Sequence, residues 1–173
     1  ATSINLLQVL LKEFCRIDDV SFKVPEQEVE ACLQDGQSVL LIGDRALAAA
    51  HNCPRHFQIT DLGALWYHFT GLPFVFALWI LRRETIEKLP LEVSALAEQL
   101  QASRDYAFNH LPDMAARLSA RTGFSAMRLE EYWRGMSYDL TDGHIEGLRL
   151  YFVLCHKHGL LEREPDFHFF AAR

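Results

Sequence analysis

The stretch TDLGALWYHFTGLPFVFALWILRRE, residues 60–84, decides the fold because it holds ten consecutive residues, Leu72–Leu81, without a polar side chain. A Gly-Leu-Pro turn opens this apolar run, and two arginines and a glutamate follow it. A transmembrane helix needs roughly 20 apolar residues, so the run is too short to span a bilayer. Its aromatic and β-branched content favours a strand. Both alternating faces are apolar, which predicts a central strand covered on both sides.

Outward from this run, helices and strands are expected to alternate along the first half of the chain. Predicted strands lie at 20–24, 38–42 and 56–59, and predicted helices follow Thr2 or Ser3, Pro25, Asp44 and Asp61. After Glu84 the pattern is mostly helical, with a break near Pro112 and a short extended segment at 136–140. Alternating helices and strands are typical of an open α/β sheet.

The composition excludes several classes of protein. Half of the 173 residues are hydrophobic, the formal net charge is −6 and the pI is about 5.7. The sequence has no basic stripe with interleaved aromatics, the feature that would indicate nucleic-acid binding. It also has no basic amphipathic helix, the feature that would indicate binding to a membrane surface. We therefore expect neither kind of partner.

Cysteines and histidines give no sign of a metal centre. The four cysteines, Cys15, Cys32, Cys53 and Cys155, form no C-x-x-C pair, so we expect mostly buried, reduced thiols in a cytoplasmic protein. His156 and His158 are two residues apart on a predicted helix and do not share a face. Structural histidines are the simpler interpretation, and no metal or cofactor site is predicted.

Three segments resemble one enzyme family. The pattern D-L-G-x-x-W-Y-x-x-T-G-L-P-F-V-F-A-x-W at residues 61–79 is similar to a signature of the futalosine-pathway menaquinone biosynthesis enzymes, specifically the chorismate dehydratases. L-L-I-G-D-R-A-L at 40–47 and G-L-R-x-Y-F-x-L, with H-G-L-L further on, at 147–161 agree with it. The resemblance runs through essentially the whole chain in order.

The resemblance implies a fold similar to type II periplasmic binding proteins, with two α/β lobes joined by hinge strands. Residues 1–75 would form the second lobe. Residues 76–173 would supply the return hinge strand and the mostly helical remainder of the first lobe. Because family members begin with a further lobe-forming segment, we expect the first lobe to be incomplete in this chain. Exposed sheet edges could then be covered in a homodimer or by a swapped element.

The implied reaction dehydrates chorismate to 3-[(1-carboxyvinyl)oxy]benzoate, without a cofactor. Thr2 and Ser3, at a helix start, would bind a substrate carboxylate through hydroxyl and backbone N–H groups. Gly43 would let the ligand approach the backbone, and Asp44 is the catalytic candidate for proton transfer. The hinge-strand residues 74–76, Phe74, Val75 and Phe76, would form the floor of the cleft.

For each of these residues a purely structural role is the competing interpretation: helix capping for Thr2, Ser3 and Asp44, and core packing for residues 74–76. Two other functions also remain open. A sister enzyme acts on cyclic dehypoxanthinyl futalosine, and its motif after the second strand looks like I-H-E, whereas this chain has I-G-D at 42–44. A non-catalytic protein of the same fold could bind a small carboxylate.

Overall fold

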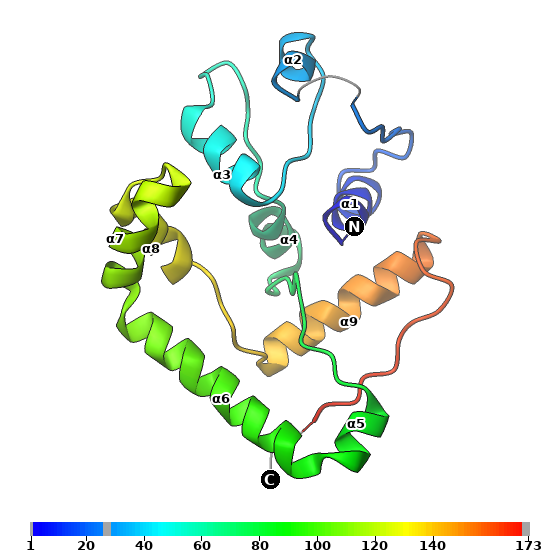
Figure 1. Cartoon of the computed structure of the whole chain (residues 1–173). Helices are drawn as coiled ribbons and strands as arrows, with labels where there is room; N and C mark the ends of the chain where they lie inside the picture. The colour runs from blue at the N-terminus through cyan, green and yellow to red at the C-terminus, as the bar shows by residue number, and fades with distance from the viewer. Residues whose placement is uncertain (1, 26–28, 171–173) are drawn as a thin grey trace. The chain divides into compact units, whose positions relative to one another are not determined.

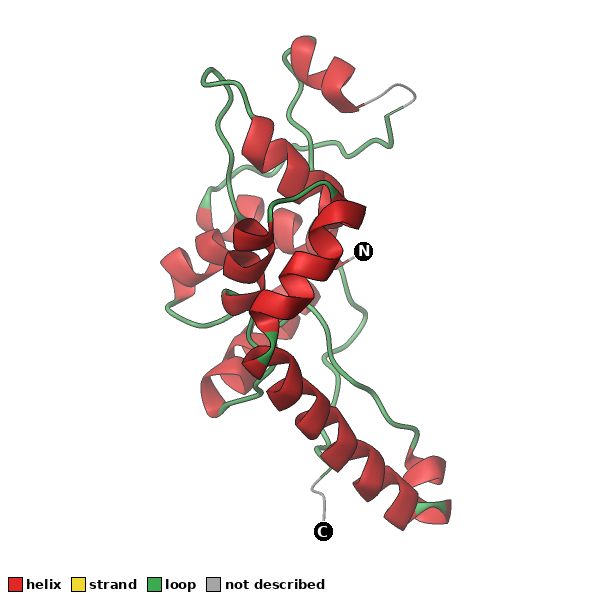
Figure 2. Ribbon diagram, turned by 60° about the vertical axis from the view of Figure 1, so that its left-hand side comes forward, coloured by secondary structure: helices red, strands yellow, loops and turns green. Residues whose placement is uncertain are grey.

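The computed structural model describes residues 2–25 and 29–170, and this part of the chain is built from helices and connecting segments (Figure 2). The helices, labelled in Figure 1, are α1 (Thr2–Val9), the π-helical turn η1 (Leu10–Phe14), α2 (Val29–Gln34), α3 (Gly43–Asn52), α4 (Leu62–Thr70), α5 (Arg83–Lys88), α6 (Pro90–Asn109), α7 (Leu111–Thr122), α8 (Ala126–Arg134) and α9 (Asp142–Lys157). The predicted start of the helix after Pro25 falls at 26–28, outside the described residues.

The other predicted helices are confirmed, but the predicted strands are not formed in residues 2–25 and 29–170. The segments 20–24, 38–42, 56–59, 72–81 and 136–140 carry no strand assignment. The prediction for 72–81 as a strand covered on both sides is therefore wrong for this structure, where Trp79 and Ile80 are more than four-fifths exposed. Residues with high β-propensity form a strand only where they can pack on a sheet beside another strand. Residues 72–81 have no neighbouring strand in the described structure, so they stay unpaired.

Local capping explains where several helices begin and end. The carboxylate of Asp61 accepts a hydrogen bond of 2.7 Å from the backbone N–H of Ala64, and Gly71 ends α4 with a φ of 68°. Ser125 accepts from the N–H of Arg128 at the start of α8. The cap at Asp61 matches the prediction of a helix that follows this residue, and both caps depend only on residues within one turn.

The first residues of two helices, α1 and α3, differ from the prediction. The N-terminal helix already includes Thr2, so Thr2 and Ser3 lie in its first turn. In α3 the cap position is Ile42, in an extended conformation, and Asp44 lies inside the first turn, so Asp44 does not cap this helix.

The chain divides into two compact units, which we describe separately. The first comprises residues 1–77 and 141–165. Its core joins α1 and η1 to α4 and α9 (Figure 1). The buried members of this core are Leu6, Val9, Leu10, Trp66, Tyr151, Leu154 and Cys155. Gly147 in α9 lets that helix approach the Gly-Leu-Pro turn, because a Cβ atom at this position would collide with the carbonyl oxygen of Pro73.

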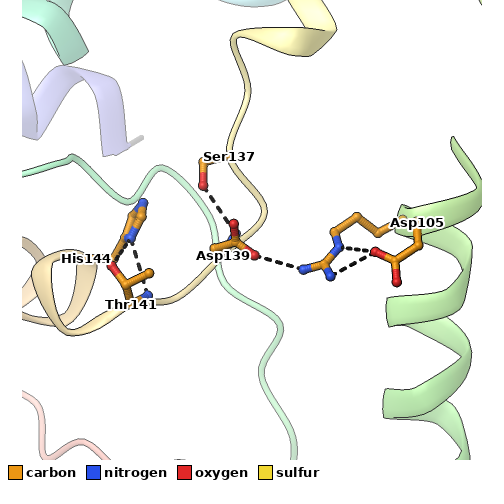
Figure 3. Close-up of polar contacts among 6 residues, drawn as sticks. Asp105, Ser137, Asp139, Thr141 and His144 are labelled. Atoms are coloured by element: carbon orange, nitrogen blue, oxygen red, sulfur yellow. Dashed lines mark hydrogen bonds and ion pairs between the residues drawn. The ribbon is translucent and has the colours of Figure 1, made fainter. Parts of the chain in front are cut away.

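The second unit comprises residues 78–140 and 166–173 and contains α5 to α8. Its packing is dominated by the neighbours α7 and α8, where Leu111, Ala115 and Leu129 are buried. Arg104 in α6 binds Asp139 at 2.9 Å and also pairs with Asp105 (Figure 3). This ion pair ties the connection at 136–140 to α6.

The cysteines are less uniformly buried than predicted: Cys32 and Cys155 are buried, Cys53 is partly exposed and Cys15 is exposed. Across the described ranges, none of the helices combines the length and apolar character needed to cross a membrane.

Candidate functional site

The candidate site lies in the first unit, where an aromatic cluster surrounds the fully buried Trp66. The ring of Trp66 is 5.5 Å from Phe74, 6.2 Å from Tyr151 and 6.4 Å from Phe14, each in an edge-to-face arrangement. Phe74 and Tyr151 also meet directly, with their ring centres 5.0 Å apart. Such contacts hold aromatic rings in fixed relative orientations. The cluster therefore fixes Phe74, one of the predicted ligand-contacting residues, against α4 and α9.

Tyr151 connects this cluster to the start of α1. Its hydroxyl group donates a hydrogen bond of 3.4 Å to the backbone carbonyl of Thr2. Burial, with a further contribution from Cys155, raises the pKa of Tyr151 well above its ordinary value of 10.0. The phenol therefore stays protonated at neutral pH and remains a donor. Thr2 itself is exposed and Ser3 is half-buried, so the predicted anion-binding turn of α1 lies at the edge of the aromatic cluster.

Residues 74–76 differ in their surroundings. Phe74 and Val75 are half-buried, whereas Phe76 is 53% exposed. The Phe76 ring lies against Phe74, at 4.7 Å between centroids, and covers Gly63 in α4, where an added Cβ would be 3.2 Å from it. The structure thus brings Thr2, Phe74 and Phe76 to one cluster built on α1, α4 and α9.

Gly43 and Asp44, unlike Thr2, Phe74 and Phe76, do not lie at the aromatic cluster. Both are exposed at the start of α3, and Gly43 has a φ of 63°, which favours glycine. Among the residues that the structure describes, the core cluster includes none from α3. Within the described residues, the Asp44 carboxylate makes no hydrogen bond or ion pair and is free to accept a proton or a hydrogen bond from a ligand.

The Gly-Leu-Pro turn that leads into residues 74–76 is held by Thr70. Its hydroxyl donates to the carbonyl of Trp66 at 2.8 Å and accepts from the N–H of Leu72 at 3.1 Å. On the other side of the turn, the backbone of Pro73 packs against Gly147. The position of Phe74 is therefore set by α4 and by α9 together.

The N-terminus of α9 carries a polar arrangement that Figure 3 shows. The backbone N–H of Thr141 points to Nδ1 of His144 at 3.3 Å, and the Thr141 hydroxyl is 2.8 Å from the same nitrogen. This places an acceptor lone pair on Nδ1 and a proton on Nε2. His144 thus closes the first turn of α9.

A charged cluster links η1 to the end of α9. The carboxylate of Glu13 accepts hydrogen bonds from Nζ of Lys157 at 2.7 and 2.8 Å, and Nε2 of His158 lies 2.9 Å from the same carboxylate. The Lys157 hydrogen bond, against an opposing effect of burial, lowers the pKa of Glu13 below its ordinary value of 4.5. His158 thus bonds a residue 145 positions away in the chain, and not a local group.

Sequence reasoning overlooked Trp66, Tyr151 and Glu13 as residues that organise this region. Trp66 and Tyr151 lie within the quoted family motifs, which is a signal that could have identified them. Glu13 and Lys157 are 144 residues apart, and no local pattern connects them. The indole N–H of Trp66 is buried without an acceptor in the described structure, an unmade hydrogen bond at the centre of the cluster.

The comparisons with known proteins agree with the motifs. The family model described as menaquinone biosynthesis matches residues 1–157, so this chain belongs to the menaquinone biosynthesis family.

Among its relatives is a protein from Thermus thermophilus named chorismate dehydratase. The two sequences are 32% identical over 165 residues, which covers 87% of this chain and 58% of the relative. The chain therefore spans somewhat more than half the length of that enzyme.

Proposed function

We propose that this chain belongs to a chorismate dehydratase, a carbon–oxygen lyase that converts chorismate to 3-[(1-carboxyvinyl)oxy]benzoate in the futalosine route to menaquinone. The observation that supports it is the family match over residues 1–157 together with the Thermus relative of that name. The reaction would take place in the cytoplasm and would need no cofactor.

The chemistry requires one ring proton and the ring hydroxyl group to leave as water, and aromatisation drives it. The protein must then hold the two carboxylates of chorismate, accept the proton and assist the departing hydroxyl. In our proposal the first turn of α1, with Thr2 and Ser3, binds one carboxylate through hydroxyl and backbone N–H groups. Residues 74–76 form an apolar floor for the ring.

Asp44 is the proposed proton-transfer group. It is exposed and unpaired in the described structure, next to a glycine that leaves its backbone accessible. We propose that a two-lobed α/β fold of the complete protein brings Asp44 and Gly43 to the ligand. In that fold residues 1–75 belong to the second lobe and residues 76–173 to the hinge and the first lobe.

The direct test is incubation of the complete protein with chorismate, followed by mass spectrometry for a product lighter by one water. Asp44→Asn should lower kcat by about 100-fold or more, the usual contribution of a positioned acid or base. Asp113→Asn is the matched control, because Asp113 is also an exposed acid in a first helical turn, that of α7. Equal activity of the two variants would remove Asp44 from the mechanism.

Two alternatives make different predictions in the same assay. Turnover of cyclic dehypoxanthinyl futalosine, but not of chorismate, would identify the sister enzyme; the I-G-D sequence at 42–44 speaks against it. A thermal shift with chorismate but no product from a folded complete protein would indicate a carboxylate-binding protein without catalysis.

A further inference from the structure

Tyr151 in α9 contacts both parts of the proposed substrate site, although it is itself only 5% exposed. Its ring centre lies 5.0 Å from that of Phe74, in the proposed floor for the substrate ring. Its hydroxyl donates a hydrogen bond of 3.4 Å to the backbone carbonyl of Thr2, 149 residues away in the chain. Core packing explains the position of the ring, but it does not explain a hydroxyl group directed at the first turn of α1.

The carbonyl that Tyr151 contacts belongs to the peptide group between Thr2 and Ser3. The C=O of Thr2 and the N–H of Ser3 are the two ends of one conjugated, planar unit. An α-helix bonds each N–H group to the carbonyl four residues earlier, so the N–H of Ser3 has no acceptor within α1, which begins at Thr2. In the proposed function this N–H group is one of those that bind a substrate carboxylate. Tyr151 therefore contacts one end of a peptide unit whose other end would meet the ligand.

A hydrogen bond at the carbonyl oxygen strengthens the N–H donor of the same peptide unit. It draws electron density toward the oxygen and leaves the amide hydrogen more positive, which is the cooperative polarisation expected in chains of hydrogen bonds. A carboxylate bound to the N–H of Ser3 would polarise the unit in the same direction, so the two hydrogen bonds should strengthen each other. At 3.4 Å the bond from Tyr151 is long for an O–H···O contact, and ligand binding should shorten it.

The geometry points to Tyr151 as a positioning residue for the substrate carboxylate: its hydroxyl polarises the peptide unit between Thr2 and Ser3 and holds the first turn of α1 against α9. The inference rests on the proposed function, in which this turn binds a carboxylate. The hydroxyl is held in place by the neighbours of the ring, since the rings of Trp66 and Phe152 have centres 6.2 Å and 5.6 Å from that of Tyr151.

The experiment measures the steady-state kinetics of the complete protein with chorismate. Independently of turnover, it measures the dissociation constant of benzene-1,3-dicarboxylate, an aromatic ring with two carboxylates, by calorimetry. Tyr151→Phe keeps the ring and removes the hydroxyl. It should raise both KM and the dissociation constant by about threefold to tenfold, the range expected for one hydrogen bond, with little change in kcat. Partial unfolding would instead lower the active fraction, and with it the apparent kcat, at an unchanged KM.

Cys155→Ala is the matched control. Cys155 is 1% exposed in the same core cluster, and its thiol is a second hydrogen-bond partner of the Tyr151 hydroxyl. The substitution disturbs the packing around Tyr151 but leaves its hydroxyl bonded to Thr2. Neither KM nor the dissociation constant should therefore rise in this variant.

Any of three results would overturn the role of Tyr151. The first is unchanged dicarboxylate binding and an unchanged KM in Tyr151→Phe. The second is an equal loss in the Tyr151 and Cys155 variants, because packing would then explain both. The third is the absence of dicarboxylate binding by the unsubstituted protein. Failure of the proposed reaction is a separate result: no product from chorismate, together with dicarboxylate binding that weakens in Tyr151→Phe, would refute the reaction and support the role of Tyr151.

Discussion

At the scale of single residues, Glu13 is the clearest example of a side chain whose negative charge stabilises the folded state. Its pKa is lowered because the hydrogen bond from Lys157 favours the carboxylate form. A carboxyl group with a lowered pKa in the folded state stabilises the fold above its ordinary pKa of 4.5. That contribution is lost as the pH falls through the lower folded value.

Glu13→Gln should therefore lower the free energy of unfolding by about 1 kcal/mol at neutral pH, the size expected for a partly exposed, hydrogen-bonded ion pair. The difference from the unsubstituted protein should shrink as the pH falls below the ordinary pKa of 4.5. Urea unfolding at a series of pH values measures both effects.

The control for this prediction is Glu130→Gln, which removes a pair with Arg134 within one helix, α8. Its expected cost is about 0.3–0.5 kcal/mol. If the Glu13 variant costs no more than the control at neutral pH, or if its cost does not change with pH, the link between η1 and α9 does not contribute as described.

At the scale of helices and turns, the contact between α9 and the Gly-Leu-Pro turn determines where the residues after Pro73 lie. The approach is close because Gly147 has no side chain, and the atom that an added Cβ would meet is a backbone oxygen, which cannot rotate away. Because Phe74 follows Pro73 directly, this packing also positions the aromatic cluster.

Gly147→Ala should destabilise the protein by about 1–3 kcal/mol, the usual cost of overpacking, despite the better helix propensity of alanine. Gly143→Ala in the same helix is the matched control, because its nearest neighbours would be 3.8 Å away, an ordinary contact. The control should be neutral or more stable by up to about 1 kcal/mol. Thermal unfolding of both variants tests the close approach, which is refuted if they behave alike.

At the scale of the whole molecule, the two compact units each have their own buried residues. Leu129 is 4% exposed in the second unit, and Leu154 is 6% exposed in the core of the first. Separate cores allow local opening of one unit while amides in the other stay protected.

Leu129→Ala should cost about 2–4 kcal/mol, as buried leucine truncations do, and should speed hydrogen exchange in α7 and α8 while leaving α1, α4 and α9 protected. Leu154→Ala should produce the reverse pattern. Loss of protection throughout the chain in either variant would mean that the two units unfold as one.

Sequence reasoning succeeded for the helices and failed for the strands for one physical reason. The cap at Asp61 and the stop at Gly71 are formed by groups within one helical turn, so the sequence contains all that is needed. The run at 72–81 has strand composition, but a ladder needs a partner that the run cannot supply. For the candidate site, Thr2 and Phe74 meet through Tyr151, which no motif spacing predicts.

By itself, the sequence determined which segments are helical, where α4 begins and ends, the family and the set of candidate residues, because these depend on neighbouring residues or on whole motifs. Only the tertiary structure decided that Trp66 and Tyr151 gather Phe74 and the start of α1, that Asp44 lies outside this core, and that Leu78–Leu81 stays unpaired and exposed. These outcomes depend on contacts between residues far apart in the chain, or on their absence, and chain order alone does not encode which distant groups meet.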